Sequence, residues 1–224
     1  MLPWQDIETV LLDMDGTLLD LHYDNDFWLN ILPGVYAEKN QLPLDETRVM
    51  LADTFRSTLG TLEFYCIDHW SERLDLDVAS LKAQHTDNIQ YLPHAEAFLT
   101  ALSEFPTQPR VILTTNAHRK VYEIKNQKLG LDKHLEAVFC ANELGAPKES
   151  SQYWHSLQKL FPFSPRRSLL VDDNQNVLRT AKDYGIAHLV MPLIPDSKKP
   201  PQIHRDEFNA IQSLEEIFPA HDAG

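Results

Sequence analysis

The chain has 224 residues, of which 43% are hydrophobic, so it is long enough to bury the core of one or two domains. Its 20 Lys and Arg residues are outnumbered by 33 Asp and Glu residues, and the formal net charge of −13 argues against nucleic acid or an anionic membrane as a partner, because both need a basic face. Its two cysteines, Cys66 and Cys140, form no CxxC pair, and its ten histidines show no compact zinc-type spacing, which fits a reducing compartment better than a disulfide scaffold.

The N-terminal segment shows no targeting signal. The run MLPWQDIETVLLD lacks the basic start and the long apolar stretch of a signal peptide. No window of the sequence approaches the roughly 18 consecutive apolar residues that a membrane-spanning helix needs. We therefore expect a soluble cytoplasmic protein.

The first predicted element is a strand, and a helical block follows it. Thr9–Leu12 is a short apolar run that ends at Asp13 and is typical of a buried strand. The segment from about 19 to 91 contains helical patterns and no convincing strand. The helices expected there are Asp26–Leu32, Asp45–Leu59, Leu62–Leu74 and Val78–Ile89.

From Arg110 onward, strand and helix patterns alternate, which favours an open parallel sheet with helices on both faces. The expected elements are, in chain order, Val111–Leu113, His118–Leu129, Ala137–Cys140, Ser151–Leu160, Ser168–Val171, Gln175–Tyr184 and His188–Met191. Gly130 and Gly185 stand where helices are expected to stop. The Pro- and Lys-containing segment Leu193–Gln202 is expected to be a surface loop before a final short helix.

The sequence Asp13-Met14-Asp15-Gly16-Thr17 follows the first strand directly. This places carboxylates at the carboxyl edge of the sheet, where open α/β folds bind their ligands. Asp-x-Asp-Gly also occurs in calcium loops, but position five would here be Thr17 and position twelve Asp24 rather than Glu. A plain turn is the other alternative, because Asp and Gly are common turn residues.

Three further groups of polar residues follow later strands. Thr115 and Asn116 come after Val111–Leu113, Lys148 follows Ala137–Cys140 by a loop, and Asp172-Asp173 ends the strand of Ser168–Val171. Each alone could be a helix cap or a solvated surface charge. All four groups at the same edge of one sheet, in this order, make coincidence a poor explanation.

This set of motifs resembles that of the haloacid-dehalogenase-like hydrolase superfamily, and the resemblance extends over the whole chain. It implies an α/β fold with a doubly wound, Rossmann-like parallel-sheet core made of residues 1–18 and 92–224. Residues 19–91, inserted after the first motif, would form the all-helical cap that such enzymes carry there.

The resemblance also implies roles for single residues. Asp13 is expected to be the nucleophile that forms an aspartyl-phosphate, and Asp15 the general acid and then base. Mg²⁺ is the expected cofactor, bound by the Asp13 carboxylate, the Asp15 carbonyl and Asp173, with Asp172 acting through water or from behind these ligands. The phosphate is expected to be held by Thr115, Lys148 and backbone N–H groups near Gly16 and Asn116, because phosphoryl transfer mainly needs positioning and charge neutralisation. Within the superfamily, dehalogenases lack an acid at the place of Asp15, so this chain is similar to the phosphatases.

The cap sequence bears on the substrate. The runs Tyr23–Trp28 and Thr61–Leu74, together with Thr115-Asn116-Ala117-His118, resemble bacterial GMP/IMP 5′-nucleotidases of this superfamily. That resemblance implies purine nucleoside 5′-monophosphates as substrates, with Asn25 and Trp28 as cap residues that set specificity. Aromatic side chains suit stacking on a base, although residues such as Phe64 and Ile67 also have the spacing of a packed helix bundle.

Three alternatives remain open at this point. The first is a phosphatase for small phosphorylated metabolites such as phosphoglycolate or a sugar phosphate. The second is a phosphomutase, which transfers the phosphoryl group to a sugar rather than to water. The third is a catalytically silent interaction protein that kept the fold, against which the clustered like charges argue.

Overall fold

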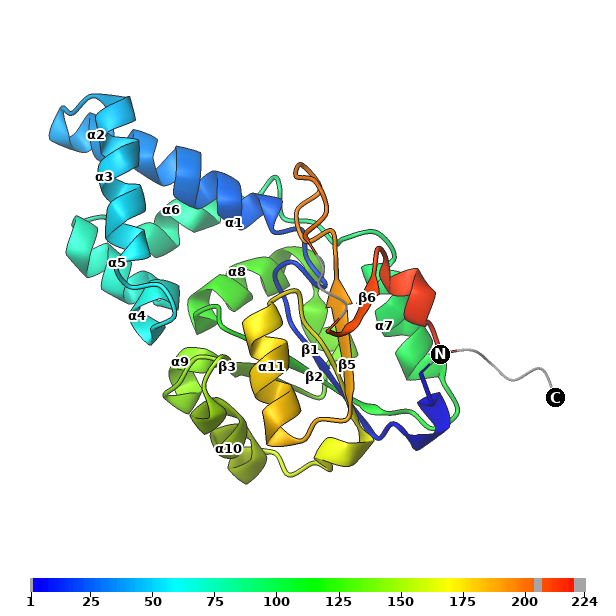
Figure 1. The fold of residues 1–224 in the computed structure, drawn as a ribbon. Helices are drawn as coiled ribbons and strands as arrows, with labels where there is room; N and C mark the ends of the chain where they lie inside the picture. The colour runs from blue at the N-terminus through cyan, green and yellow to red at the C-terminus, as the bar shows by residue number, and fades with distance from the viewer. Residues whose placement is uncertain (1, 204–206, 220–224) are drawn as a thin grey trace.

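The computed structural model describes residues 2–203 and 207–219, and its centre is a six-stranded sheet in which every strand pairs parallel to its neighbours (Figure 1). From edge to edge the strands are β3 (Ala137–Cys140), β2 (Arg110–Thr115), β1 (Thr9–Leu12), β4 (Ser168–Val171), β5 (His188–Pro192) and β6 (Asn209–Ile211). This parallel α/β architecture is the one expected from the alternation of strand and helix patterns.

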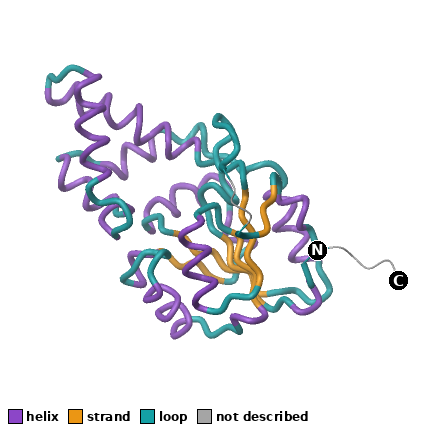
Figure 2. Tube along the Cα trace, in the orientation of Figure 1, coloured by secondary structure: helices purple, strands orange, loops and turns teal. Residues whose placement is uncertain are grey.

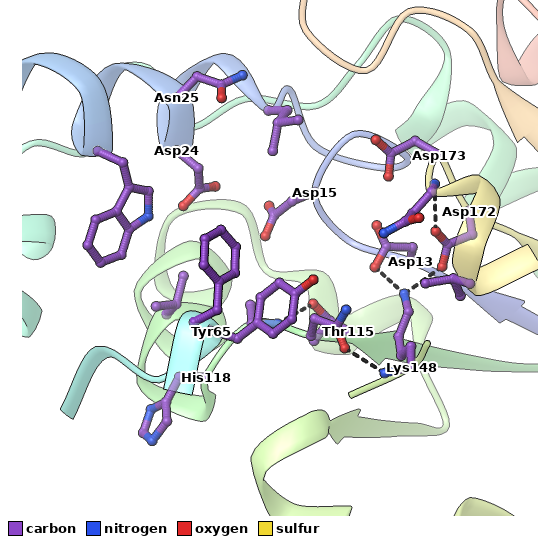
Figure 3. Close-up of a pocket in the computed structure, with 18 of the residues that line it drawn as sticks. Asp13, Asp15, Asp24, Asn25, Tyr65, Thr115, His118, Lys148, Asp172 and Asp173 are labelled. Carbon is purple, nitrogen blue, oxygen red and sulfur yellow. Dashed lines mark hydrogen bonds and ion pairs between the residues drawn. The ribbon is translucent and has the colours of Figure 1, made fainter. Parts of the chain in front are cut away.

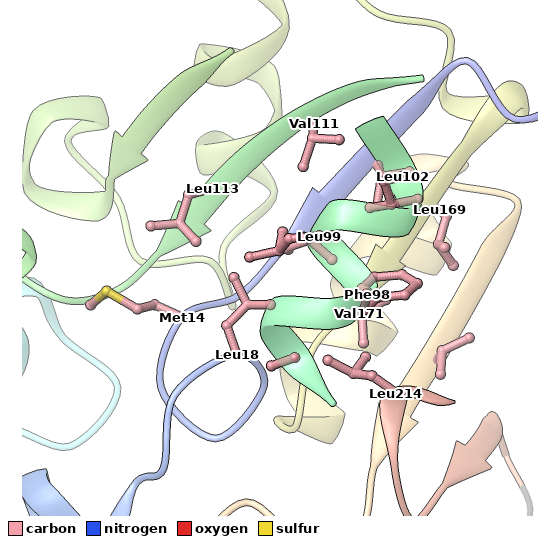
Figure 4. Close-up of a cluster of buried hydrophobic side chains, with 14 of the residues drawn as sticks. Met14, Leu18, Phe98, Leu99, Leu102, Val111, Leu113, Leu169, Val171 and Leu214 are labelled. Carbon is pink, nitrogen blue, oxygen red and sulfur yellow. The ribbon is translucent and has the colours of Figure 1, made fainter. Parts of the chain in front are cut away.

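Helices cover both faces of the sheet, because successive strand residues point to opposite sides. On one face, Val10 and Leu12 belong to a cluster that also contains Phe98 and Leu99 of α7 (Ala95–Glu104). Figure 4 shows Phe98, Leu99 and Leu102 of this helix beside Val111 and Leu113 of β2 and Leu169 and Val171 of β4. On the other face, Leu11 belongs to a second cluster that contains residues of α10 (Ser151–Leu160) and α11 (Gln175–Tyr184). The remaining elements around the sheet are η1 (Trp4–Asp6), α8 (Arg119–Leu129), η3 (Leu131–His134), α9 (Ala141–Leu144), η4 (Pro165–Arg167) and η5 (Leu214–Ile217).

A group of helices lies beyond the carboxyl ends of the strands, and we call it the helical cap (Figures 1 and 2). It consists of α1 (His22–Asp26), the π-helical turn η2 (Phe27–Ile31), α2 (Leu32–Asn40), α3 (Leu44–Arg56), α4 (Leu62–Tyr65), α5 (Ile67–Leu74) and α6 (Val78–Gln84). Its helices pack around a cluster of their own that includes Phe27, Leu51 and Trp70, each at most 1% exposed. The two connections to the sheet run side by side, since Leu19 bridges Tyr91 and the Asp20 N–H donates to the Gln90 carbonyl at 3.0 Å.

Several element boundaries differ from the sequence expectations. The helix expected at Asp26–Leu32 runs almost without a break over α1, η2 and α2; its wide π turn precedes Pro33, which has no N–H to donate. The helix expected at Leu62–Leu74 breaks at Cys66, which is extended and caps α5 through its sulfur. The one expected at Val78–Ile89 already ends at Gln84.

Three elements were not expected from the sequence: α7, the one-turn helix α9 and the edge strand β6. The final short helix is only the 3-10 turn η5. Leu193–Gln202 contains no helix or strand, as expected. Among the described residues no helix has the length and apolar character needed to cross a membrane.

Candidate active site

The polar groups that the sequence placed at strand ends come together at the carboxyl edge of the sheet (Figure 3). Asp13 directly follows β1, Thr115 ends β2, and Asp172 and Asp173 follow β4. Backbone hydrogen bonds between neighbouring strands fix the positions of these residues. The Asp13 N–H donates to Val171 O at 3.0 Å, and the Asp172 N–H donates to Val190 O at 3.1 Å. Both peptide groups thus extend the pairing of the central strands by one residue.

Lys148 is the cation at the centre of this group. Its Nζ lies 2.5 Å from Asp13 Oδ1 and 2.6 Å from Asp172 Oδ2, and it donates to the Thr114 carbonyl at 2.8 Å. The side chain is 2% exposed, and the two carboxylates raise the pKa of its ammonium group although burial opposes this. Lys148 is therefore a fixed positive charge beside Asp13.

Asp13, Asp172 and Asp173 each offer one oxygen within 4.8 Å of the others. Burial raises the pKa of Asp13 to about 7, against the attraction of Lys148. Burial and the charges of Asp13 and Asp172 raise the pKa of Asp173 well above its ordinary value. Three carboxylates thus face one ammonium group, and this arrangement of hard oxygen donors suits a divalent cation.

The two adjacent aspartates have different surroundings. Both oxygens of Asp172 are engaged, since Oδ1 accepts the Asn174 N–H at 2.9 Å and Oδ2 pairs with Lys148. Within residues 2–203 and 207–219, the hydrogen bond that the Asp173 carboxylate accepts is a long one from Gln202 Nε2, at 3.3 Å to Oδ2. Asp173 is accordingly the freer of the two to bind an ion.

Gly16 allows the loop after β1 to approach Asp173 closely. Its φ of +89° is rarely adopted by residues with a side chain, and a Cβ there would lie 2.8 Å from Asp173 Cγ and 2.9 Å from Pro195 Cβ. A larger residue at position 16 would therefore displace the loop, the aspartate or both.

Asp15 lies on the same cavity wall as Asp13 but in a separate ion-pair environment. Its Oδ1 accepts a hydrogen bond from Lys125 Nζ at 2.5 Å, and the same ammonium group binds Asp24 Oδ2 at 2.5 Å. Burial is the largest influence on Asp15 and raises its pKa to about 7, although Lys125 opposes the shift.

The residues expected around the phosphate also lie here, although their side chains have different partners. The Thr115 hydroxyl accepts the Ala117 N–H at 3.0 Å. The Asn116 side chain is occupied, because its Oδ1 accepts the Lys148 N–H at 2.9 Å and its Nδ2 donates to Glu149 Oε2 at 2.9 Å. Asn116 thus holds the Lys148 segment in place, and its backbone N–H is proposed below as a donor to an anion.

A cavity of about 790 Å³ extends from these carboxylates to the helical cap. The cap side of the cavity is aromatic and is lined by Trp28, Phe55, Phe64, Tyr65 and Trp70. Trp28 meets Phe55 edge-on at a centroid distance of 5.4 Å. Asn25 also lines the cavity, and its Nδ2 donates to Asp196 Oδ2 at 2.7 Å, so its amide group is held by the loop that follows β5.

Four site residues were not singled out from the sequence: Asp24, Tyr65, Lys125 and Glu149. Asp24 and Tyr65 stand within the cap runs that were noted there, but nothing in those runs distinguishes them from their neighbours. Lys125 stands within a helical pattern as an ordinary lysine, and Glu149 beside Lys148 has the appearance of a surface charge. Their contacts depend on how the cap meets the sheet, and local sequence does not carry that information.

Comparisons with known proteins agree with this geometry. The sequence profile of haloacid dehalogenase-like hydrolases matches residues 7–185. The chain is 36% identical over 194 residues to the GMP/IMP nucleotidase YrfG of Escherichia coli strain K12, covering 87% of this chain and 86% of that protein.

Solved structures with the same fold include a HAD phosphatase from Thermococcus onnurineus, with a TM-score of 0.78 at 19% identity over 94% of this chain and 96% of that one. The HAD-hydrolase YfnB of Bacillus subtilis, solved with bound magnesium, gives a TM-score of 0.66 at 17% identity over 95% and 97% of the two chains. These structural similarities establish the fold.

Proposed function

The chain belongs to the haloacid dehalogenase-like hydrolases, and we propose that it is a Mg²⁺-dependent phosphomonoesterase that acts on purine nucleoside 5′-monophosphates such as GMP and IMP. The observation that carries the phosphatase assignment is the pair Asp13 and Asp15. Both carboxyl groups line one cavity, one beside Lys148 and the other beside Lys125. A nucleophile and a separate acid on the same wall are what cleavage of a phosphate ester needs.

In the proposed reaction an Asp13 oxygen attacks phosphorus and forms an aspartyl-phosphate. The bond from phosphorus to the ester oxygen breaks, and the departing oxygen takes the proton of the Asp15 carboxyl group. Asp15, now a carboxylate, then accepts a proton from a water molecule whose oxygen attacks phosphorus. The bond from phosphorus to the Asp13 oxygen breaks, which frees the Asp13 carboxylate and releases inorganic phosphate. Asp13 and Asp15 thereby return to their starting protonation states.

Lys148 and Thr115 have the positions to hold phosphate oxygens. The Lys148 ammonium group is held beside Asp13 and places a positive charge next to the proposed site of attack; its three N–H groups face Asp13, Asp172 and the Thr114 carbonyl, so it would exchange one of these partners for a phosphate oxygen. Thr115 offers its hydroxyl from the end of β2. The backbone N–H groups near Gly16 and Asn116 complete the proposed phosphate site.

The carboxylates fit a magnesium ion in chemistry and in surplus negative charge. We propose that the Asp13 carboxylate, the Asp15 carbonyl and Asp173 hold it, while Asp172 acts indirectly because Lys148 occupies one of its oxygens. When bound, the ion would offset the charge of the phosphate and of the surrounding carboxylates.

The proposed substrate class rests on the cap side of the cavity and on the nucleotidase similarity. Aromatic walls can stack on a purine, and Trp28 is the cap residue proposed to do so. Asn25 is proposed to act beside it, although its amide already binds Asp196. We further propose that residues 19–91 work as a cap over a core of residues 1–18 and 92–224, and that the enzyme is cytoplasmic.

The test is a phosphate-release screen of the purified protein with and without Mg²⁺, across nucleoside monophosphates, sugar phosphates and phosphoglycolate. We expect release that depends on Mg²⁺ and is fastest with GMP and IMP. Preference for a small phosphometabolite would replace the nucleotide assignment, and no release from any phosphomonoester would overturn the proposed function.

A further inference from the structure

Four charged side chains form an unbroken series of ion pairs that starts at Asp15. Lys125 Nζ lies 2.5 Å from Asp15 Oδ1 and 2.5 Å from Asp24 Oδ2, and Lys82 Nζ lies 2.8 Å from Asp24 Oδ1. We call this series Lys82–Asp24–Lys125–Asp15 the ion chain. Its charges alternate in sign, so each inner group is neutralised from both sides.

The two lysines of the ion chain are almost fully buried. Their side chains are 1% exposed, whereas Asp24 and Asp15 are 15% and 16% exposed. The ammonium group of Lys82 also lies over the rings of Tyr23 and Phe27, with centroid distances of 4.5 and 4.1 Å. Groups enclosed in this way have few alternative positions, so the ion chain fixes its end member.

The ion chain joins two parts of the fold. Asp15 stands in the loop after β1 and Lys125 on α8 beside the sheet, whereas Asp24 and Lys82 belong to helices α1 and α6 of the cap. In Figure 3, Asp24 faces Asp15 across the upper part of the cavity. Any shift of the cap that takes Asp24 away from Lys125 would therefore alter what holds Asp15.

The contacts of Asp15 leave one oxygen available for chemistry. Lys125 occupies Oδ1, while Oδ2 accepts no hydrogen bond from the part of the chain that the structure describes. A carboxyl group held by one oxygen has a defined orientation for the other. Misplacing such a group by about 1 Å can cost on the order of 100-fold in rate.

We propose that Lys125 and Asp24 are positioning residues that orient Asp15 toward the leaving-group oxygen. Because Asp24 belongs to the helical cap, this orientation depends on the contact between the cap and α8. The inference rests on the proposed phosphatase reaction. It goes beyond that reaction by assigning a role to two buried residues that touch neither the phosphate site nor the three clustered carboxylates.

A purely structural role is the competing explanation, because buried ion pairs also hold domains together. The positioning role and the purely structural role predict different effects for substrates with different leaving groups. An alkyl phosphate such as a nucleotide needs an acid to protonate its departing oxygen, whereas an aryl phosphate with a good leaving group needs little help. The later attack of water on the phosphoenzyme also uses Asp15 and is common to both substrates, so the comparison uses kcat/KM, which reports the steps up to departure of the leaving group. Loss of positioning should therefore lower kcat/KM for GMP and spare kcat/KM for 4-nitrophenyl phosphate.

The experiment compares Lys125→Met and Asp24→Asn with the unmodified enzyme on these two substrates. We expect kcat/KM for GMP to fall about 10- to 100-fold and kcat/KM for 4-nitrophenyl phosphate to fall less than about 3-fold. In an Asp15→Asn background, Lys125→Met should cause no further loss with GMP, because there is no longer an acid to orient.

Lys120→Met is the matched control. Lys120 lies on the same helix, pairs with Asp68 of the cap at 2.6 Å and is 50% exposed, but it does not contact Asp15. The Lys120→Met substitution removes a contact between cap and sheet while leaving the ion chain intact, so both kcat/KM values should stay near those of the unmodified enzyme.

Removing one member of a buried pair can destabilise the fold, so thermal unfolding is measured alongside activity. The variant Asp24→Asn/Lys82→Met removes one charge of each sign, and the same selective loss is expected from it. Equal losses on both substrates, or no loss on either, would overturn the positioning inference. Inactivity of the unmodified enzyme toward both substrates would instead overturn the proposed function.

Discussion

The Tyr65 hydroxyl of the cap donates a 2.9 Å hydrogen bond to Glu149 Oε1, next to Lys148. Glu149 also accepts from the side chains of Asn116 and Asn174, at 2.9 and 3.0 Å. Through these bonds one cap residue is linked to the segments that follow β2, β3 and β4. The position of the cap is thereby linked to the segments that carry the proposed phosphate site.

Replacing Tyr65 with Phe tests this link. The variant loses only the hydroxyl, and a hydrogen bond to a charged group contributes about 1.5–3 kcal/mol, so we expect kcat/KM for GMP to fall about tenfold or more. Steady-state kinetics provide the measurement. Tyr36→Phe, on α2 and outside the cavity lining, should leave kcat/KM unchanged; an unaltered kcat/KM in Tyr65→Phe would show that the link is dispensable.

Asp13→Asn should nearly abolish turnover while the fold remains intact, because the change is almost isosteric. Asp15→Asn should still form some phosphoenzyme from substrates with good leaving groups, since these need less help from an acid. Acid quenching followed by mass spectrometry would detect the phosphorylated peptide. Turnover at the normal rate in Asp13→Asn, with contaminating phosphatases excluded, would rule out the covalent mechanism.

Metal removal gives a separate prediction. Treatment with EDTA should remove activity and Mg²⁺ should restore it, whereas Ca²⁺ should inhibit because its larger and looser coordination shell misplaces the nucleophile. Asp173→Asn should raise the Mg²⁺ concentration needed for half-maximal activity more than Asp172→Asn does, because Asp172 is engaged by Lys148. Full activity after exhaustive chelation would contradict the proposed magnesium site.

Trp28 is the cap residue on which the proposed specificity depends most. Trp28→Leu should lower kcat/KM for GMP and IMP about tenfold or more, since a stacked base contributes about 1–3 kcal/mol. Hydrolysis of 4-nitrophenyl phosphate should change far less, because that compound makes few cap contacts. Equal losses on GMP and on the aryl phosphate would mean that Trp28 supports the fold of the cap rather than the base. Asn25 is a less clean target, because its replacement also breaks the bond to Asp196.

The parts of the site that the sequence predicts are those encoded locally. Asp13, Thr115 and Asp172-Asp173 each stand directly after or at the end of an apolar strand, so their meeting at one sheet edge follows from a parallel sheet. Lys148 was recognisable from its place in the order of motifs. These residues need no knowledge of the cap.

The ion chain was not predictable in this way, because Asp24 and Lys125 are 101 positions apart and meet only when the cap lies over α8. Some helix and strand boundaries were also predicted wrongly from the sequence. The break at Cys66 interrupts an otherwise continuous helical pattern, and β6 is a three-residue strand added at the sheet edge. At Cys66 a local cap, in which the sulfur accepts the His69 N–H, begins α5, whereas β6 exists through its pairing with β5.

The central claim is most directly tested by comparing kcat/KM for GMP, CMP and phosphoglycolate on the unmodified enzyme with saturating Mg²⁺. In the proposed site the residues at the sheet edge hold the phosphate, so we expect discrimination among these substrates to come from the cap side of the cavity. We expect kcat/KM for GMP to exceed that for CMP and for phosphoglycolate by about tenfold or more. Equal kcat/KM for all three would contradict the purine assignment and leave a general phosphatase.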